Sequence, residues 1–397
     1  MLEPWATFLL GTILAVVGVE VAERLLARPR SPLALVVARQ RTMLTFFFLA
    51  VAVTGAPIRS AGLAVVVILV MHVATRIKQA MISEPLVFSD FRLALQTFRY
   101  PAITIGVLPW PQRIVSVVVL GSIPVVGAFG ITGEILPRIL AAGLLLGLRH
   151  GPSGRWIVAT LADRLRPLMP APDPVAHIGR YGVAATIGAY RVLWQSAPEP
   201  DFSALPKDLR PDAPKVVVLV QSESYCDPVR LGISGEAPAA LTALSPRALA
   251  HGDLAVSGDG AYTVRTEMAM LTGLSDEDLG FDRFDPYRRG ERFAGASLAH
   301  RLAAKGYATR FLHPFHPGFY RRDAVMPAFG FERFLDIDDF ADAPRLGPHV
   351  SDAALAERIF AEIDAAAGPV FVYAVTMENH GPWHDGRIVP GAGATAQ

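Results

Sequence analysis

The sequence predicts a multi-span helical membrane region followed by an α/β domain with a mostly parallel sheet. Hydrophobic residues make up 52% of the 397-residue chain, more than is usual in a soluble protein. The longest apolar runs lie in residues 1–150. Charge is divided as well: residues 1–160 hold 14 Lys and Arg against 6 Asp and Glu, whereas the rest holds 23 against 30. Such a division indicates two regions with different surroundings. No basic patch with interleaved aromatic residues points to nucleic acid as a partner.

Residues 1–150 are the predicted membrane anchor, with four to five spans. The first apolar run, Trp5–Val21, is about long enough to cross a bilayer, and it lacks the basic start and the cleavage site of a signal peptide. Three further runs predict spans. A fifth run contains Pro137 and Arg138, so it is either a span or a helix lying on the membrane surface. These four later runs are Met43–Val53, Ala61–Val73, Ile114–Gly130 and, as the fifth, Ile135–Leu148.

Lysine and arginine residues orient the anchor. They gather in the loops after the first and third runs, which are therefore expected to be cytoplasmic. With four spans the C-terminal domain emerges on the extracytoplasmic side, whereas five spans would place it inside. The basic residues are Arg24, Arg28, Arg30, Arg39 and Arg41 in the first loop and Arg76, Lys78, Arg92, Arg99 and Arg113 in the second.

Residues 151–214 are rich in proline and predict an extended connector arm around one helix near Ile178–Gln195. Three apolar runs in residues 215–397 then predict strands: Val216–Val220, Ala308–Leu312 and Val370–Val375. The first run is continuous and mostly β-branched, so it is expected to be buried on both faces. Helical patterns alternate with these strands, which predicts a parallel sheet covered by helices. The helical segments are Ala239–Ala250, broken at Pro246, Glu267–Leu271, Ala294–Lys305 and Asp352–Ala366.

Ionisable residues follow each of the three predicted strands. Glu223 follows the first, His313 the second and His380 the third. Ligands of open α/β sheets gather at the carboxyl ends of the strands, so the three ends together indicate a site, although turns are polar in any protein.

Several candidates also have a purely structural interpretation. Glu223 is either a metal ligand or a solvated turn carboxylate. Thr266 is either a plain helix N-cap or a hydroxyl in the positive field of a helix start, where phosphate binds well. Arg322 is either a phosphate-binding fork or half of a surface ion pair with Asp323 or Glu332.

Histidine and cysteine leave similar choices open. His313 and His316 are either metal ligands or structural residues of a proline-rich loop, and His380 is either functional or a satisfied loop histidine. Cys226 is the one cysteine, so it cannot form an intramolecular disulfide. Nothing around it argues for the lowered pKa of a catalytic thiol.

Taken in order, four motifs resemble the lipoteichoic acid synthase family. That family includes phosphoglycerol transferases of periplasmic glucans and capsules, and it belongs to the sulfatase and alkaline phosphatase superfamily. The resemblance covers the whole chain in architecture and residues 215–383 in motifs. The motifs are Gln221-Ser222-Glu223-Ser224, Thr263–Met268 continuing through Leu271–Leu274, Phe319–Asp323 and Met377–Trp383.

The resemblance implies a sulfatase-like α/β fold in a multi-pass protein of the bacterial plasma membrane, with the catalytic domain on the extracytoplasmic side. It also implies transfer of a phosphoglycerol group from phosphatidylglycerol to a glycan or polymer acceptor. Thr266 matches the nucleophile, and Glu223 together with Thr266 matches ligands of a manganese or magnesium ion. A metal would activate the threonine hydroxyl, and oxygen ligands suit both ions. The residues that match substrate contacts are His313, Tyr320, Arg322 and His380.

One departure from the family pattern concerns the metal. Family members carry an Asp-His pair of metal ligands beyond the motif of His380, whereas here no Asp-His follows and His384-Asp385 stands in the reverse order. We therefore expect a domain that is incomplete at its C-terminus. Two alternative functions stay open: a phosphoethanolamine transferase or other superfamily phosphotransferase or hydrolase, and a non-catalytic truncated protein that binds anionic lipid heads. A sulfatase is disfavoured because Thr266 lies in no formylglycine motif.

Overall fold

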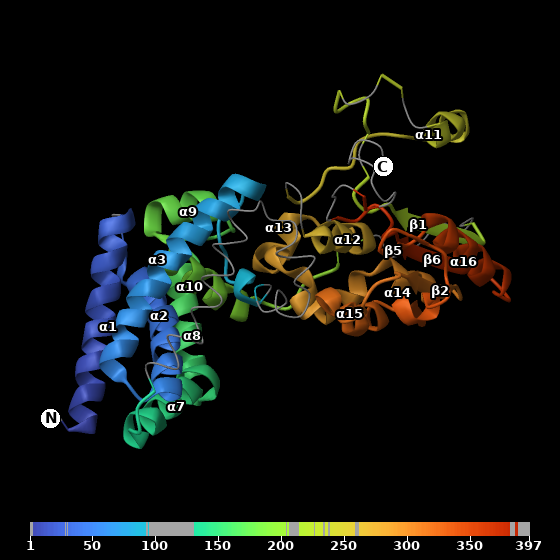
Figure 1. The fold of residues 1–397 in the computed structure, drawn as a ribbon. Coiled ribbons are helices and arrows are strands. Elements are labelled where there is room, and N and C mark those ends of the chain that lie inside the picture. Colours follow the sequence, from blue (N-terminus) through green and yellow to red (C-terminus); the bar gives the residue numbers. More distant parts are fainter. Residues whose placement is uncertain are drawn as a thin grey trace. The chain divides into compact units, whose positions relative to one another are not determined.

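The computed structural model describes residues 3–27, 29, 31–92, 94, 131–203, 205, 214–225, 227–232, 235–236, 239–258, 262–381 and 386–387. The chain forms two compact units (Figure 1). The helical unit contains residues 1–199 together with 258–261 and 279–284. The α/β unit contains residues 200–257, 262–278 and 285–397.

Among the described residues of the helical unit, three helices are long and apolar enough to cross a membrane: α1 (Pro4–Ala27), α2 (Leu33–Thr54) and α3 (Pro57–Ile82). They confirm the first three predicted apolar runs as helices. Helices α1 and α3 pack closely through small residues, because a Cβ at Gly11 would lie 2.6 Å from the Cβ of Pro57. Small residues at contacts are typical of helices that associate in membranes.

The next described helix is α7 (Ile135–His150), which corresponds to the fifth predicted run and is shorter than the three spanning candidates. Its Arg138 donates hydrogen bonds to the carbonyl oxygens of Val53, Thr54 and Thr132 at 2.7, 3.2 and 2.7 Å. The guanidinium thus satisfies carbonyl groups that the end of α2 leaves free. The predicted run Ile114–Gly130 lies outside the described residues.

The expected extended arm is wrong over residues 152–177, whereas the helix expected near Ile178–Gln195 is present as the end of α9 and as α10. Residues 152–195 form α8 (Pro152–Leu165), α9 (Pro174–Tyr181) and α10 (Val183–Gln195), which belong to the helical unit. Prolines that suggested an extended chain instead occupy the first positions of α8 and α9, where a missing N–H costs nothing. The apolar and small residues of α10 are almost all buried.

The α/β unit contains a four-stranded parallel sheet in the order β1-β6-β2-β3. Strands β2 (Ala308–Leu312) and β6 (Val370–Val375) have the predicted bounds, and β1 (Val216–Gln221) is one residue longer. Strand β3 (Arg333–Leu335) was not predicted, because three residues are too few to show a periodic pattern. A small antiparallel pair, β4 (Arg345–Leu346) with β5 (His349–Val350), lies beyond it in sequence.

Helix α16 (Asp352–Asp364) packs against β2 and β6 on one face of the sheet, over Leu312, Val372 and Ala374. The opposite face carries aromatic rings of Phe311 and Tyr373, whose centroids lie 5.3 Å apart. The remaining helical segments of the described residues are α11 (Ala239–Leu244), η1 (Ser245–Arg247), α12 (Thr263–Thr272), α13 (Asp276–Leu279), η2 (Gly280–Phe284), η3 (Pro286–Ala296), α14 (Leu298–Ala303), η4 (Phe319–Arg321), α15 (Arg322–Ala328) and η5 (Ile337–Phe340). Of these, η2 belongs to the helical unit.

The prediction that the first strand is buried on both faces is wrong. Val216, Val218 and Val220 are 45%, 42% and 51% exposed. Their register partners in β6 lie under α16, but β1 is at the end of the sheet and beyond the reach of that helix. A β-branched run therefore indicated a strand but not its position within the sheet.

Gly182 supplies a test of packing in the helical unit. Its φ is +87°, and a Cβ there would lie 1.8 Å from Oε1 of the buried Glu23. We expect Gly182→Ala to lower the free energy of unfolding by about 2 kcal/mol or more, because it adds backbone strain to a clash. Gly179→Ala is the matched control, since a Cβ there meets no atom within 4 Å. Thermal unfolding of the detergent-solubilised chain measures both, and equal midpoints for the two variants would contradict this packing.

Candidate active site at the ends of the parallel strands

Glu223 lies in the turn that follows β1, with its side chain buried. The turn is tied to the end of β6, because the Glu223 N–H donates to Thr376 Oγ1 at 3.1 Å and the Thr376 N–H donates to the Gln221 carbonyl at 3.0 Å. Burial, followed by the negative charge of Glu267, raises the pKa of the Glu223 carboxyl. The alternative of a solvated turn carboxylate is therefore wrong.

Gln221, the last residue of β1, joins two carboxylates. Its Oε1 accepts a hydrogen bond of 2.7 Å from the Tyr373 hydroxyl, which fixes the orientation of the amide. The amide nitrogen then donates to Glu223 Oε1 at 2.9 Å and to Glu267 Oε1 at 3.4 Å. The two acids are thereby held on either side of one NH₂ group.

Arg322 and Glu267 form a buried, two-pronged ion pair. The Arg322 Nε donates to Glu267 Oε2 at 3.2 Å, and its second prong donates to Oε1. The Tyr287 hydroxyl adds a bond of 2.9 Å to Oε2. Burial lowers the pKa of the Arg322 guanidinium, but Glu267 raises it by more, so the net shift is upward. The alternative of a surface ion pair with Asp323 or Glu332 is wrong, because the arginine is buried and its partner is Glu267.

His313 and Tyr320 lie beside this pair. A ring nitrogen of His313, the residue after β2, is 3.2 Å from the Val375 carbonyl oxygen, so Nδ1 carries a proton and donates it. Burial, and then the charge of Arg322, lower the pKa of His313 well below its usual value. The Arg322 guanidinium lies 5.5 Å from the centre of the Tyr320 ring, within the range of a cation–π contact. Burial raises the pKa of Tyr320 to about 12.

His380 follows β6 in a short turn, where its Nδ1 lies 2.9 Å from the Gly381 carbonyl oxygen. Its charge opposes the rise that burial causes in the pKa of Glu223, and it adds to the fall that burial causes in the pKa of His313. The three strand ends singled out in the sequence therefore meet in one electrostatic neighbourhood. His384 and Asp385, like Cys226, lie outside the described residues.

Thr266 is the fourth residue of α12, which begins at Thr263 with Tyr262 in the N-cap position. The alternative of a plain N-cap is therefore wrong. The Thr266 side chain is half-buried, and within the described chain its hydroxyl makes no hydrogen bond. The next residue in α12, Glu267, belongs to the buried charged cluster.

Strained backbone surrounds these residues. A positive φ is uncommon for residues other than glycine, and each costs on the order of 1–3 kcal/mol when the side chain is not suited to it. Among the described residues five non-glycine positions have one, and four of these flank the candidate site. The four are Ser224, Tyr262, Tyr320 and Arg321, with φ of 55°, 56°, 57° and 60°.

Glu267 was not among the predicted site residues, although it adjoins Thr266 and lies in one of the four motifs. The signal that the sequence carries is an acidic residue directly before an apolar stretch, Met268–Leu271, of a predicted helix.

The described residues fit a divalent cation in part. Glu223 and Glu267 bring two negative charges, and Arg322 brings one positive charge, so this buried group carries net negative charge. Cations stabilise buried carboxylates, and the Glu223 carboxylate and the Thr266 hydroxyl are the hard oxygen donors that Mg²⁺ and Mn²⁺ prefer. Over the described residues, however, no three His, Cys, Asp or Glu side chains come together as a metal cage.

Known proteins resemble this chain in sequence. Residues 215–396 match the Sulfatase family model. The chain is 30% identical over 345 residues to the capsular polysaccharide biosynthesis protein RkpI of Rhizobium meliloti strain 1021, with 79% of this chain and 62% of that protein covered. It is 34% identical over 174 residues to a putative cyclic β-1,2-glucan modification protein of the same strain, with 44% and 27% covered. This chain thus spans less than two thirds of the length of either relative.

Among solved structures, the integral membrane lipooligosaccharide phosphoethanolamine transferase A (EptA) of Neisseria meningitidis aligns with a TM-score of 0.42 at 15% identity, covering 89% of this chain and 70% of that one. The family assignment rests on the sequence match, which begins where the parallel sheet begins. Residues 215–396 of this chain are therefore a sulfatase-family domain, which follows a region of membrane-type helices in the sequence.

Proposed function

We propose that the protein is a membrane-anchored transferase that moves a phosphoglycerol group from phosphatidylglycerol to a glycan or polymer acceptor. Thr266 is the nucleophile, and a Mn²⁺ or Mg²⁺ ion held by Glu223 and Thr266 is the cofactor. The observation that carries the proposal is a buried cluster of two carboxylates and one arginine, with Thr266 directly before one of these carboxylates, Glu267, in helix α12. The sulfatase-family match of this domain supports it.

The reaction divides into two displacements. The Thr266 oxygen attacks phosphorus, the bond to the diacylglycerol oxygen breaks, and diacylglycerol leaves with a proton. The threonine then carries the phosphoglycerol group as a diester until an acceptor hydroxyl displaces it. A bound divalent ion would supply the lowered pKa that a threonine hydroxyl needs in order to attack.

The phosphoglycerol group would be held by Arg322, His313, Tyr320 and His380. Glu267 occupies Nε and one terminal nitrogen of Arg322, while the other terminal nitrogen makes no hydrogen bond within the described chain. That nitrogen is suited to a phosphoryl oxygen. His313 donates from Nδ1 to a carbonyl, so its Nε2 is the acceptor of the neutral ring and is suited to a glycerol hydroxyl.

The membrane helices support a lipid as the donor, and the relatives support a glycan as the acceptor. A lipid donor accounts for an enzyme domain joined to three candidate membrane helices. The names of both Rhizobium relatives concern a polysaccharide or a glucan, which supports a glycan acceptor. We place catalysis on the extracytoplasmic side of a bacterial plasma membrane, because basic residues gather after the first and third apolar runs. Of these residues, Arg39 and Arg41 lie in α2 and Arg76 and Lys78 lie in α3, and not in loops as expected.

Replacement of Thr266 tests the nucleophile. We expect the whole protein in detergent with Mn²⁺ to release diacylglycerol from phosphatidylglycerol, and Thr266→Ala to lower this rate by about 10³-fold or more, because the attacking oxygen is lost. Thr263→Ala, on the same helix and equally half-buried, should keep the wild-type rate. Mass spectrometry of wild-type protein quenched early should locate phosphoglycerol on Thr266.

The choice of lipid separates the proposal from its alternatives. Release of diacylglycerol from phosphatidylethanolamine but not phosphatidylglycerol would make the protein a phosphoethanolamine transferase. Binding of anionic vesicles without release from either lipid would favour the non-catalytic interpretation.

Replacement of Glu223 tests the metal. We expect the whole protein to bind Mn²⁺ in a calorimetric titration, and Glu223→Gln to weaken that binding by about 100-fold or more, because a charged oxygen ligand is lost. Glu362→Gln is the control, since Glu362 is an equally buried carboxylate on α16. Equal Mn²⁺ affinity in wild type and Glu223→Gln would exclude this ligand.

A further inference from the structure

Glu267 is the hub of the charged cluster. Each of its carboxylate oxygens accepts two hydrogen bonds: Oε1 from Gln221 and Arg322, and Oε2 from Tyr287 and Arg322. These donors come from β1, η3 and α15, while Glu267 itself belongs to α12. One side chain thus ties together β1, η3, α12 and α15, of which α12 carries Thr266 and α15 carries Arg322.

We propose that Glu267 is a positioning residue of the transfer reaction: its carboxylate holds the guanidinium fork of Arg322 so that the remaining terminal nitrogen meets the transferring phosphoryl group. This rests on the proposed function. Through Gln221 the same carboxylate also fixes the distance to Glu223, and through its own backbone it is joined to Thr266. The proposed nucleophile Thr266, the phosphate-binding Arg322 and the proposed metal ligand Glu223 are thereby linked through one side chain.

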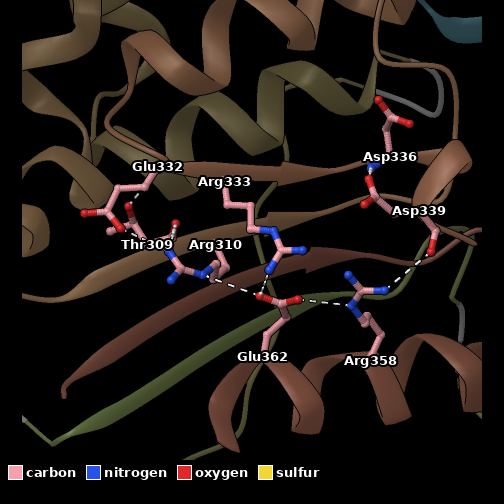
Figure 2. Close-up of polar contacts among 8 residues, drawn as sticks. All are labelled: Thr309, Arg310, Glu332, Arg333, Asp336, Asp339, Arg358 and Glu362. Atoms are coloured by element: carbon pink, nitrogen blue, oxygen red, sulfur yellow. Dashed lines mark hydrogen bonds and ion pairs between the residues drawn. The ribbon is translucent and has the colours of Figure 1, made fainter. Parts of the chain in front are cut away.

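A second buried glutamate in the same domain, Glu362, has contacts typical of a residue that stabilises the fold. Glu362 contacts three arginines, Arg310, Arg333 and Arg358, at 3.5, 3.1 and 3.1 Å (Figure 2). These arginine side chains are 19%, 51% and 29% exposed. All three therefore stay in partial contact with solvent. Arg310 of β2 and Arg333 of β3 join the sheet to Glu362 of α16, whereas Arg358 belongs to α16 itself.

The pair at the site differs from this surface network in solvation. The side chains of Glu267 and Arg322 are 0% and 3% exposed. A fully desolvated ion pair contributes little net stability, and an apolar pair of the same volume often stabilises as well or better. What such a pair does supply is a fixed direction for the guanidinium fork. The presence of this buried pair, despite its desolvation cost, is therefore better explained by positioning of Arg322 at the site than by stability of the fold.

Charge and geometry predict opposite changes in phosphate affinity when the Glu267 carboxylate is lost. Glu267→Gln removes one negative charge from the site, and charge alone would then make a phosphate group bind more tightly. Loss of the fork's anchor would instead let Arg322 turn away, so that phosphate binds more weakly and transfer slows. The sign of the change separates a positioning residue from a charge that merely happens to be near.

The test compares wild type, Glu267→Gln and Glu362→Gln, each as the whole chain in detergent. We expect Glu267→Gln to lower kcat for diacylglycerol release by about 10- to 100-fold, because misplacement of a positioning group costs that much. We also expect it to weaken binding of glycerol phosphate, measured by calorimetry without turnover. Glu362→Gln removes the same charge from a buried arginine-bound carboxylate, and it should lower the unfolding midpoint while leaving kcat and glycerol phosphate binding unchanged.

Glycerol phosphate binding at wild-type strength or tighter in Glu267→Gln, with unchanged kcat, would overturn the inference. If Glu267→Gln does not fold, Arg322→Lys takes its place, since lysine keeps the charge but cannot be held as a fork. Wild-type activity and binding in Arg322→Lys would likewise overturn it. Weakened binding in Glu267→Gln, together with no lipid cleavage by wild type, would uphold the positioning of Arg322 and reject the proposed function.

Discussion

Two buried carboxylates, Glu223 and Glu267, both accept hydrogen bonds from the amide nitrogen of Gln221. Their mutual repulsion determines which charged groups must lie around them. Like charges so near each other require compensation in a site with little water. Arg322 compensates one of them through a two-pronged contact. The other has no cationic partner bonded to it within the described chain, which leaves its neutralisation to a proton or to a metal ion.

The backbone brings these side chains together partly through strained conformations. Parallel pairing of β1, β6 and β2 brings Gln221, Val375 and Leu312 to one edge of the sheet, and the polar turns follow immediately. Strained residues then redirect the chain, with Tyr320 and Arg321 placing Arg322 at the start of α15. Strain of this kind persists where the surrounding packing fixes it, and it is concentrated at functional sites.

Sequence alone predicted the parts of the fold that have strong periodic patterns. Strands β2 and β6 and the helices α1 to α3 followed from apolar runs, and the meeting of Glu223, His313 and His380 followed from their places after strands. What failed depends on three-dimensional neighbours. The exposure of β1 depends on where α16 ends, the burial of Arg322 depends on a partner 55 residues away, and the prolines of residues 152–195 could start helices as easily as prevent them.

The uncovered edge of β1 has a consequence for handling this protein. One side of the strand is unpaired in the described sheet, and the valines on the α16 face are largely open to solvent. An exposed, β-branched edge strand is a template onto which another chain can add its own strand. Any preparation in which nothing covers this edge would therefore tend to self-associate through β1. A charged substitution at Val218, in the middle of the exposed row, would be a direct way to keep the domain monomeric.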